Sequence, residues 1–303
     1  MARAREAMAQ PGVAPRPERF IEVLGPAVHQ AAAIAHAMEG RARNRPKWGE
    51  ASDVKAALTL ADCAAQEAVL VSLLAHFPEV CLAAEEDTPS AAAFPATGPA
   101  RVVVDPIDGT LHSYLEQRGP YACMVGLCVA GRFEAGIVAL PREGLFLDGR
   151  RGAGARRTRP RGTARPWRAQ ATGARVLVSY NMPGSVVQKL QRAGYEVAFG
   201  CGGAISVAPL IPGVRAGLRL ANTNPEGVSI RGRVGLCIAR AAGALVTTES
   251  GAAFPEEVTA PAPILVVAAE QQDVALLQEA VHGVLETTSA GSRVPRPPPG
   301  GSR

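Results

Sequence analysis

The sequence is poor in aromatic residues, which make up 4% of its 303 residues. Proteins that bind single-stranded nucleic acids usually stack the bases on aromatic side chains, so this composition argues against that class. The formal net charge of +5 does not by itself indicate an anionic macromolecule, because the excess is largely arginine in the two terminal segments and in residues 150–168. We therefore expect no nucleic-acid partner.

Cysteine pairs at metal-ligand spacing and long apolar runs are also missing. The six cysteines form no CxxC motif and mostly lie inside apolar runs, which predicts buried free thiols rather than a zinc site or a disulfide framework. No run of about 18 apolar residues is present, as a membrane-spanning helix would require. The N-terminal segment lacks the apolar stretch of a secretory signal. We therefore expect a cytoplasmic protein with no membrane partner.

The chain does contain enough apolar residues, 47% of the total, for a sizeable core. Apolar residues at three- and four-residue spacing predict helices over 18–44 and 60–77. Apolar runs predict strands over 80–84, 101–104 and 145–147, with a hairpin over 121–140 between the last two. In the second half we expect strands over 175–179, 195–199, 243–248 and 264–268, helices over 184–193, 203–214, 234–242 and 271–286, and a loop over 222–233.

The irregular alternation of these elements predicts a layered α/β (α+β) fold rather than a doubly wound parallel sheet. We expect an N-terminal α+β part over 19–165 and a C-terminal α/β part over 166–287. The arginine-rich residues 150–168 are predicted to be an exposed loop that connects the two parts. Residues 1–18 and 288–303 are rich in proline, glycine and arginine, and we expect them to be disordered tails.

Four carboxylates follow or begin the predicted elements of the first half. Asp62 lies at the start of a helix, Glu85 and Asp105 each come just after a strand, and Asp108 is three residues further on. If neighbouring strands end at one edge, these side chains come together, and like charges at short range raise one another's pKa. A hard divalent cation resolves this repulsion, and an all-oxygen ligand set favours Mg²⁺, Ca²⁺ or Mn²⁺ over zinc.

The segment 105–110, DPIDGT, has a composition suited to such a site. Pro106 turns the chain out of the strand, so that both aspartates face one place and the carbonyl of Ile107 is left available as a ligand. Gly109 allows the backbone to approach a ligand closely, and Thr110 offers a hydroxyl and an amide to a phosphate oxygen. The alternative interpretation is a simple turn with an aspartate cap, and it is weakened by Glu85 and Asp62 upstream.

These motifs resemble the inositol monophosphatase family of Mg²⁺-dependent, lithium-sensitive sugar and nucleotide phosphatases. The resemblance rests on DPIDGT after an apolar strand, on the Glu-Glu pair about 20 residues before it, and on a T-x-A-D element earlier still. It continues through the hairpin, Gly202-Gly203-Ala204 and the C-terminal AAGALVTTESG, and covers roughly residues 20–270. It implies a sandwich of alternating helix and sheet layers and, as is common in the family, a homodimer.

The resemblance also implies roles for individual residues. Asp62 and Thr110 would position and activate the attacking water, and the amides of Gly109 and Thr110 would hold the phosphate of a small phosphorylated substrate. Gly202 and Gly203 match a turn that contacts the sugar. The cation would be Mg²⁺, with Mn²⁺ as an option, and four ligands are implied: Glu85, Asp105, the carbonyl oxygen of Ile107, and Asp108.

The sequence departs from the family pattern at several positions. The family motif W-D-x-A-A-G, whose aspartate bridges metals beneath the phosphate, corresponds here to residues 238–243, so that Ile238 and Ala239 replace the Trp-Asp pair. An aspartate six residues before Asp62 is replaced by Ala56, and the Thr-Asn after DPIDGT by residues 111–112. The first metal site is thus predicted to be whole and the second damaged. Glu226 is considered as a substitute ligand, although an exposed loop residue is the plainer interpretation.

The predicted function is therefore a metal-dependent phosphomonoesterase that hydrolyses a sugar, cyclitol or nucleotide monophosphate by direct water attack. Two alternatives stay open. One is an activity of the bisphosphate nucleotidase or fructose-bisphosphatase type, in which Arg231 and Arg233 bind a second phosphate. The other is a non-catalytic or repurposed family member, because the last metal-binding aspartate is replaced by Ala239.

Overall fold

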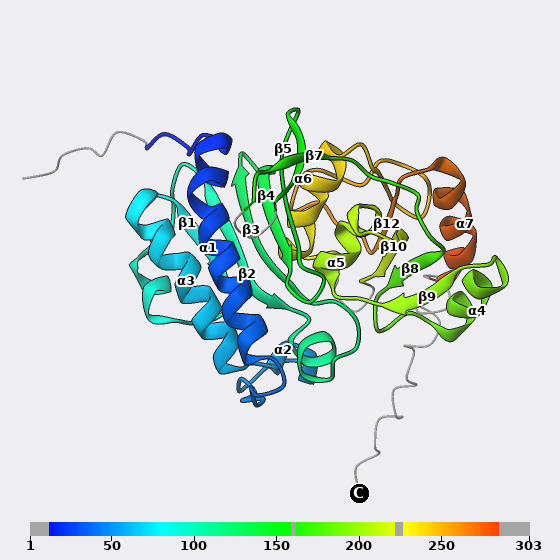
Figure 1. Cartoon of the computed structure of the whole chain (residues 1–303), viewed down its shortest axis with the longest axis horizontal. Helices are drawn as coiled ribbons and strands as arrows, with labels where there is room; N and C mark the ends of the chain where they lie inside the picture. The colour runs from blue at the N-terminus through cyan, green and yellow to red at the C-terminus, as the bar shows by residue number, and fades with distance from the viewer. Residues whose placement is uncertain (1–11, 159–161, 222–226, 285–303) are drawn as a thin grey trace, which may run out of the picture.

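The computed structural model describes residues 12–158, 162–221 and 227–284. Its first half forms a seven-stranded sheet whose strands follow one another in chain order (Figure 1). Only the first pair of this sheet is parallel, and its other pairs are antiparallel. The strands are β1 (Cys81–Ala84), β2 (Arg101–Asp108), β3 (Ala122–Val129), β4 (Arg132–Leu140), β5 (Leu145–Arg150), β6 (Gly154–Thr158) and β7 (Arg165–Trp167).

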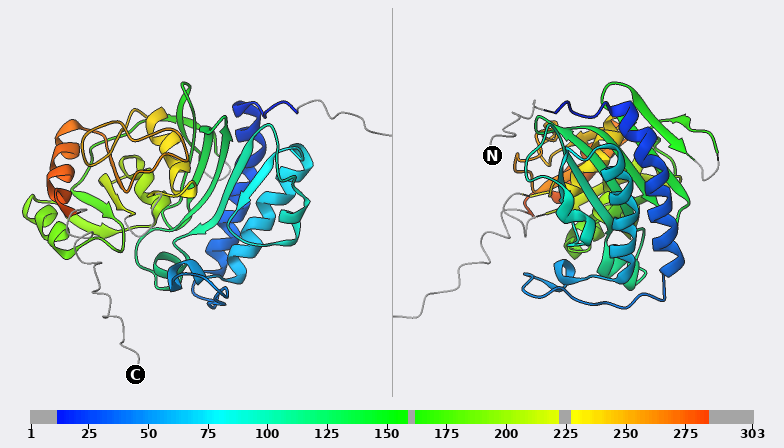
Figure 2. Two further views of the ribbon diagram at one scale, coloured as in Figure 1. Left: turned by 180° about the vertical axis from the view of Figure 1, so that it is seen from behind. Right: turned by 90° about the vertical axis from the view of Figure 1, so that its left-hand side faces the viewer.

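Two long helices cover one face of the large sheet, α1 (Pro17–Met38) and α3 (Leu60–His76). The right-hand view of Figure 2 shows both in front of the strands. The apolar side chains of α1 recur at helical spacing, and they pack with those of α3 and of β2 to β4 into one core. Three short helical segments complete this half: α2 (Asp53–Ala56), η1 (Pro89–Ala93) and η2 (Thr110–Leu115).

The second half forms a five-stranded sheet with the strand order β11-β12-β10-β8-β9. Its strands are β8 (Arg175–Val178), β9 (Glu196–Phe199), β10 (Val214–Leu220), β11 (Leu245–Thr247) and β12 (Ile264–Ala268). The helices α4 (Gly184–Arg192) and α7 (Gln271–Val281) cover its outer face, with a core of their own. Between the sheets lie α5 (Gly202–Ser206), α6 (Val234–Ala241) and two short turns, η3 (Ala208–Leu210) and η4 (Arg231–Arg233).

The molecule is thus a stack of helices, sheet, helices, sheet and helices (Figure 1). This confirms the predicted layered fold. Five of the six cysteines are buried, as their apolar surroundings predict. Among the described residues, no helix is long and apolar enough to cross a membrane.

Two predicted segments are wrong. Residues 150–168, expected to be a connecting loop, contain β6 and β7, which extend the large sheet at its edge. The helix predicted over 203–214 ends at Ser206, and residues 214–220 form β10, the central strand of the second sheet. In β10 the partly exposed Arg215 and Arg219 lie four residues apart between buried residues, a spacing that puts both on one face of a strand.

Other boundaries differ less. The first helix begins at Pro17, inside the predicted N-terminal tail, and ends at Met38 rather than at residue 44. The remainder of both predicted tails, and Glu226, lie largely or wholly outside the described residues. The two sheets are built from residues 81–167 and 175–268, while the division of the chain at residue 165 stays a prediction.

Candidate active site

The parallel pairing of β1 and β2 brings two of the predicted carboxylates together. Ala84 lies opposite Val104 in this pair, so Glu85 and Asp105 follow at the same edge of the sheet. β2 then continues through an irregularity between Asp105 and Asp108, where its pairing with β3 shifts. The spacing of the carboxylates in the sequence therefore predicts their neighbourhood correctly.

Asp62 joins this group from the start of α3. The N-cap residue Thr59 donates to Asp62 Oδ2 from both its backbone N, at 2.7 Å, and its hydroxyl, at 2.6 Å. This capping box fixes the carboxylate of Asp62 in a fully buried position. Burial raises the pKa of Asp62 to about 6, although the hydrogen bonds from Thr59 and Thr110 work in the opposite direction.

Thr110 links Asp62 to the DPIDGT turn. Its hydroxyl lies 3.0 Å from Asp62 Oδ1 and 2.8 Å from the carbonyl oxygen of Ile107. A hydroxyl carries one proton, so only one of these oxygens accepts it at any moment. The pair predicted to act on water, Asp62 and Thr110, is therefore in direct contact, and a predicted metal ligand lies beside it.

Gly109 is required by the conformation of this turn. Its φ is +89°, and a Cβ added there would lie 2.7 Å from the Cβ of Cys201. The turn therefore packs directly on the start of α5. The amide of Gly203 donates to Asp108 Oδ2, so the predicted sugar-binding turn contacts a predicted metal ligand.

Cys201 is buried beside Asp108, and burial together with that carboxylate raises the pKa of its thiol. The thiol therefore stays protonated at neutral pH and is a poor nucleophile.

Arg231 lies among the carboxylates. Its Nη2 is 3.3 Å from Glu85 Oε1, and its Nε is 3.5 Å from Asp105 Oδ2. Burial alone would lower the pKa of Arg231, but Glu85, Asp105 and Asp108 outweigh this effect and raise it. The arginine predicted to bind substrate is thus already paired with two predicted metal ligands.

This pairing leaves some acceptors unused. Glu85 Oε2 and Asp105 Oδ1 are buried and have no hydrogen-bond partner. Burial, together with the charges of Glu85 and Asp108, raises the pKa of Asp105 well above its usual range. One guanidinium therefore does not neutralise the group, and positive charge is still lacking.

The donor set is suited to a hard divalent cation. The three carboxylates and the carbonyl of Ile107 are all oxygen ligands, and two of the carboxylate oxygens are buried and unpaired. In this conformation, however, no three His, Cys, Asp or Glu side chains of the described chain are arranged to hold a metal ion. Arg231 and the amide of Gly203 occupy oxygens that such an ion would use. The residues fit the cation chemically, and the guanidinium competes for them.

Glu86, the second member of the Glu-Glu pair, anchors the strand end. The side-chain amide of Gln66 accepts a hydrogen bond from the backbone N of Glu86, at 3.0 Å, and donates one to the carbonyl oxygen of Glu86, at 2.6 Å. Lys47 forms an ion pair with the carboxylate of Glu86 at 3.1 Å. Burial raises the pKa of Glu86 to about 7 even though Lys47 opposes the shift. Gln66 and Lys47 thus hold the chain next to Glu85, and neither has a motif by which sequence reasoning finds it.

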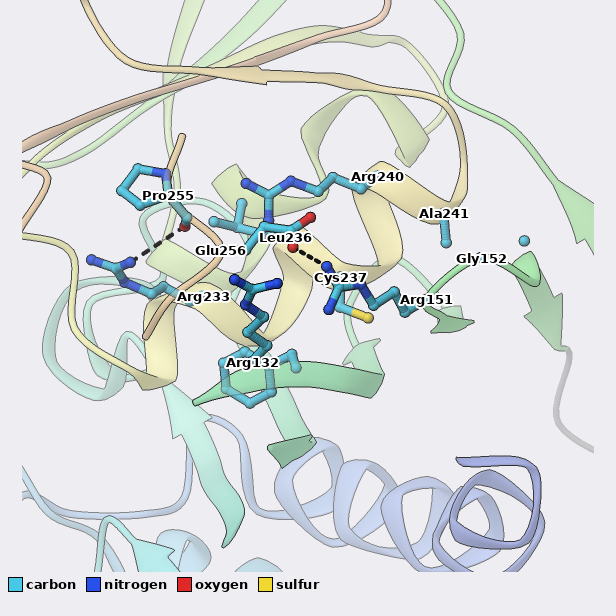
Figure 3. Close-up of a pocket in the computed structure, with 12 residues that line it drawn as sticks. Arg132, Arg151, Gly152, Arg233, Leu236, Cys237, Arg240, Ala241, Pro255 and Glu256 are labelled. Carbon is cyan, nitrogen blue, oxygen red and sulfur yellow. Dashed lines mark hydrogen bonds and ion pairs between the residues drawn. The ribbon is translucent and has the colours of Figure 1, made fainter. Parts of the chain in front are cut away.

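Arg233 lies in a different environment. It is 3% exposed, and its guanidinium donates to the backbone carbonyls of Val228, Glu257 and Ala260. It borders a cavity of about 400 Å³ that α6 shares with the start of β4, the β5–β6 turn and residues 255–256 (Figure 3). These hydrogen bonds to backbone carbonyls serve the fold, and none of them supports the prediction that Arg233 binds substrate.

Ala239 and Ile238 are both fully buried in the core between the sheets. Ile238 packs against Gly149 of β5, where an added Cβ would lie 2.8 Å from the Cα of Ile238. The helix that carries an aspartate in the family motif therefore presents an apolar pair, and α6 supplies no carboxylate from this position.

The geometry describes a layered α/β protein in which oxygen donors that suit a hard cation gather where the parallel pairing of β1 and β2 ends. The chain belongs to the inositol monophosphatase family, whose sequence profile matches residues 20–211. This match ends before the segment 238–243, where the chain departs from the family motif. Membership supports a metal-dependent phosphatase in general, since the family uses divalent metal ions.

Solved structures show the same fold. The Thermotoga maritima IMPase superposes with a TM-score of 0.68 at 18% identity, covering 88% of this chain and 99% of its own. The extragenic suppressor protein SuhB of Bartonella henselae gives 0.67 at 17% identity, with the same coverage. A staphylococcal IMPase-I complexed with products gives 0.64 at 17%, covering 89% of this chain and 98% of its own. The search of curated proteins gave no match.

Proposed function

We propose that this protein is a metal-dependent phosphomonoesterase that hydrolyses a sugar, cyclitol or nucleotide monophosphate by direct attack of water. The observation that carries the proposal is the contact of Asp62 with Thr110 beside the unpaired oxygens of Glu85 and Asp105. A base, its hydroxyl partner and a cation-binding group are the parts that such a hydrolysis needs.

Each site residue has its own role in this proposal. Asp62, ionised and held by Thr59, accepts the proton of the attacking water, and the Thr110 hydroxyl orients that water. The amides of Gly109 and Thr110 bind phosphate oxygens, and Gly202 and Gly203 border the rest of the substrate. Mg²⁺ or Mn²⁺, when bound, polarises the phosphoryl group and lowers the pKa of water. Its proposed ligands are Glu85, Asp105, Asp108 and the carbonyl of Ile107.

A phosphate-release screen tests this proposal. Sugar phosphates, inositol phosphates and nucleotides are incubated with the protein and with MgCl₂ or MnCl₂, and EDTA serves as the blank. We expect release from at least one monophosphate that requires the cation. Absence of release from every substrate with either cation contradicts the proposal.

The alternative of a non-catalytic or repurposed member is favoured by one observation, the apolar pair at Ile238 and Ala239. The variant Ala239→Asp separates the two possibilities in the same screen. If the natural protein is a phosphatase, it releases phosphate without this change. Release by Ala239→Asp alone shows that the natural protein has given up hydrolysis.

The pH dependence of the reaction tests the role of Asp62. Because burial raises its pKa to about 6, the carboxylate becomes protonated as the pH falls through that value, and activity is lost. We expect kcat/KM to fall about tenfold for each pH unit below the apparent pKa. Initial rates between pH 5 and 8 measure this limb.

Thr59 offers the matched variants. Its hydroxyl donates to Asp62 and stabilises the charged form, so Thr59→Val should move the acidic limb to higher pH, whereas Thr59→Ser should leave it in place. A limb that is the same in all three proteins would remove Asp62 from the role of base.

We also propose the homodimer implied by the resemblance, which light scattering measures directly.

A further inference from the structure

Arg219, on the strand β10 that the sequence did not predict, lies with its guanidinium between two glycines. A Cβ added to Gly202 would lie 2.6 Å from Arg219 Cζ, and one added to Gly232 would lie 2.9 Å from the same atom. Such distances are shorter than real contacts, so the arginine occupies space that only glycine leaves free at both positions. The space between the two glycines, the Arg219 seat, therefore holds the guanidinium in a defined position.

This seat borders the proposed active site on two sides. Gly202 precedes Gly203, whose amide binds Asp108, and Gly232 follows Arg231, which pairs with Glu85 and Asp105. Arg219 thus lies at the junction of the two segments that the C-terminal half contributes to the site.

The guanidinium of Arg219 has no acceptor in the part of the chain that the structure describes. Its Nη1 is buried and has no hydrogen-bond partner, and no ion pair involves this residue among the described ones. The neighbouring arginines are already engaged, since Arg231 pairs with carboxylates and Arg233 with backbone carbonyls. A buried charged donor left unsatisfied is costly and calls for a partner that the described residues do not provide.

We propose that Arg219 binds a second anionic group of the substrate, so that the preferred substrates carry a phosphomonoester and, in addition, a phosphate or carboxylate. The proposal rests on the proposed function for the identity of the first group. It replaces Arg233 by Arg219 as the partner of the second anion. A planar guanidinium is suited to either oxyanion, because it binds both through two parallel hydrogen bonds.

Binding measurements test this without turnover. Dissociation constants are measured by calorimetry in EDTA for fructose 6-phosphate, fructose 1,6-bisphosphate and 6-phosphogluconate. The two latter probes add a phosphate and a carboxylate respectively, so they distinguish the two sources of the anion. We expect at least one of them to bind the wild type about tenfold more tightly than the monophosphate, the scale of one charged hydrogen-bonding contact.

Two variants and one control assign that preference to Arg219. Arg219→Ala should reduce the ratio to near one while changing monophosphate binding less than threefold, or about 0.65 kcal/mol. Gly232→Ala keeps Arg219 but places a methyl group in its seat, so it should reduce the ratio as well. Arg192→Ala, which removes an exposed arginine of α4, should keep the wild-type ratio.

The outcomes separate this inference from the proposed function. A preference that survives in Arg219→Ala, or no preference in the wild type, overturns it. Equal weakening of all three probes also overturns it, because a merely structural arginine would act in that way. If the preference depends on Arg219 but no phosphate is released with Mg²⁺, the subsite stands and the phosphatase proposal fails.

Discussion

Asp108→Asn should abolish phosphate release, lowering kcat by about 100-fold or more. Asp108 is a proposed ligand of the cation and accepts a hydrogen bond from Gly203, in the turn proposed to contact the substrate. Replacing the carboxylate by a neutral amide weakens the hold on the cation that would stabilise charge at the reacting phosphate, and the loss of one such group from a preorganised site has this magnitude. Initial rates with the substrate found in the screen, at saturating MgCl₂, measure the effect.

Asp108→Asn keeps the hydrogen bond that the side chain of residue 108 accepts. The asparagine side-chain oxygen still accepts the hydrogen bond of the Gly203 amide, so the melting temperature should change little. Asp53→Asn, at an exposed position of α2, is the matched control and should retain wild-type activity. Activity of Asp108→Asn close to that of the wild type would exclude this carboxylate from the reaction.

The sequence predicts that the carboxylates are neighbours because the signals for this are local. The parallel pairing of β1 with β2 ends at Ala84 and Val104, directly before Glu85 and Asp105, so the strand register alone brings these two carboxylates together. Asp62 is predicted at the start of a helix, and there a capping box fixes its side chain. Such features depend on a few consecutive residues and on general rules of strand and helix ends.

The interactions of the arginines are not predicted, because they depend on contacts between distant segments. Arg231 and Arg233 are two residues apart, yet one pairs with the carboxylates and the other with carbonyls near residues 228 and 257–260. Arg219 lies on β10, a strand that the sequence does not predict, so the position of its side chain between Gly202 and Gly232 could not be predicted either. In each case the tertiary packing decides what a long charged side chain contacts.

Arg231→Ala should make the protein depend on a divalent cation for its stability. The guanidinium is the cation that Glu85 and Asp105 contact in this structure, and its removal leaves the buried carboxylate of Asp105 and the partly buried one of Glu85 without this partner. Removal of one member of a buried pair costs about 3–5 kcal/mol, but the Arg231 side chain is 37% exposed and solvent reduces the cost. We expect the free energy of unfolding in EDTA to fall by about 1–3 kcal/mol.

The same substitution should strengthen cation binding, because the ion no longer competes with the guanidinium for Glu85 and Asp105. Melting temperatures measured in EDTA and in MgCl₂ should therefore differ more for Arg231→Ala than for the wild type, and calorimetry should give a lower Kd for Mg²⁺. Arg231→Lys retains a positive charge without the planar fork and should lie between the two. If Mg²⁺ stabilises Arg231→Ala no more than the wild type, the carboxylates do not hold the cation, and Arg231 is then a permanent structural counter-ion of the site.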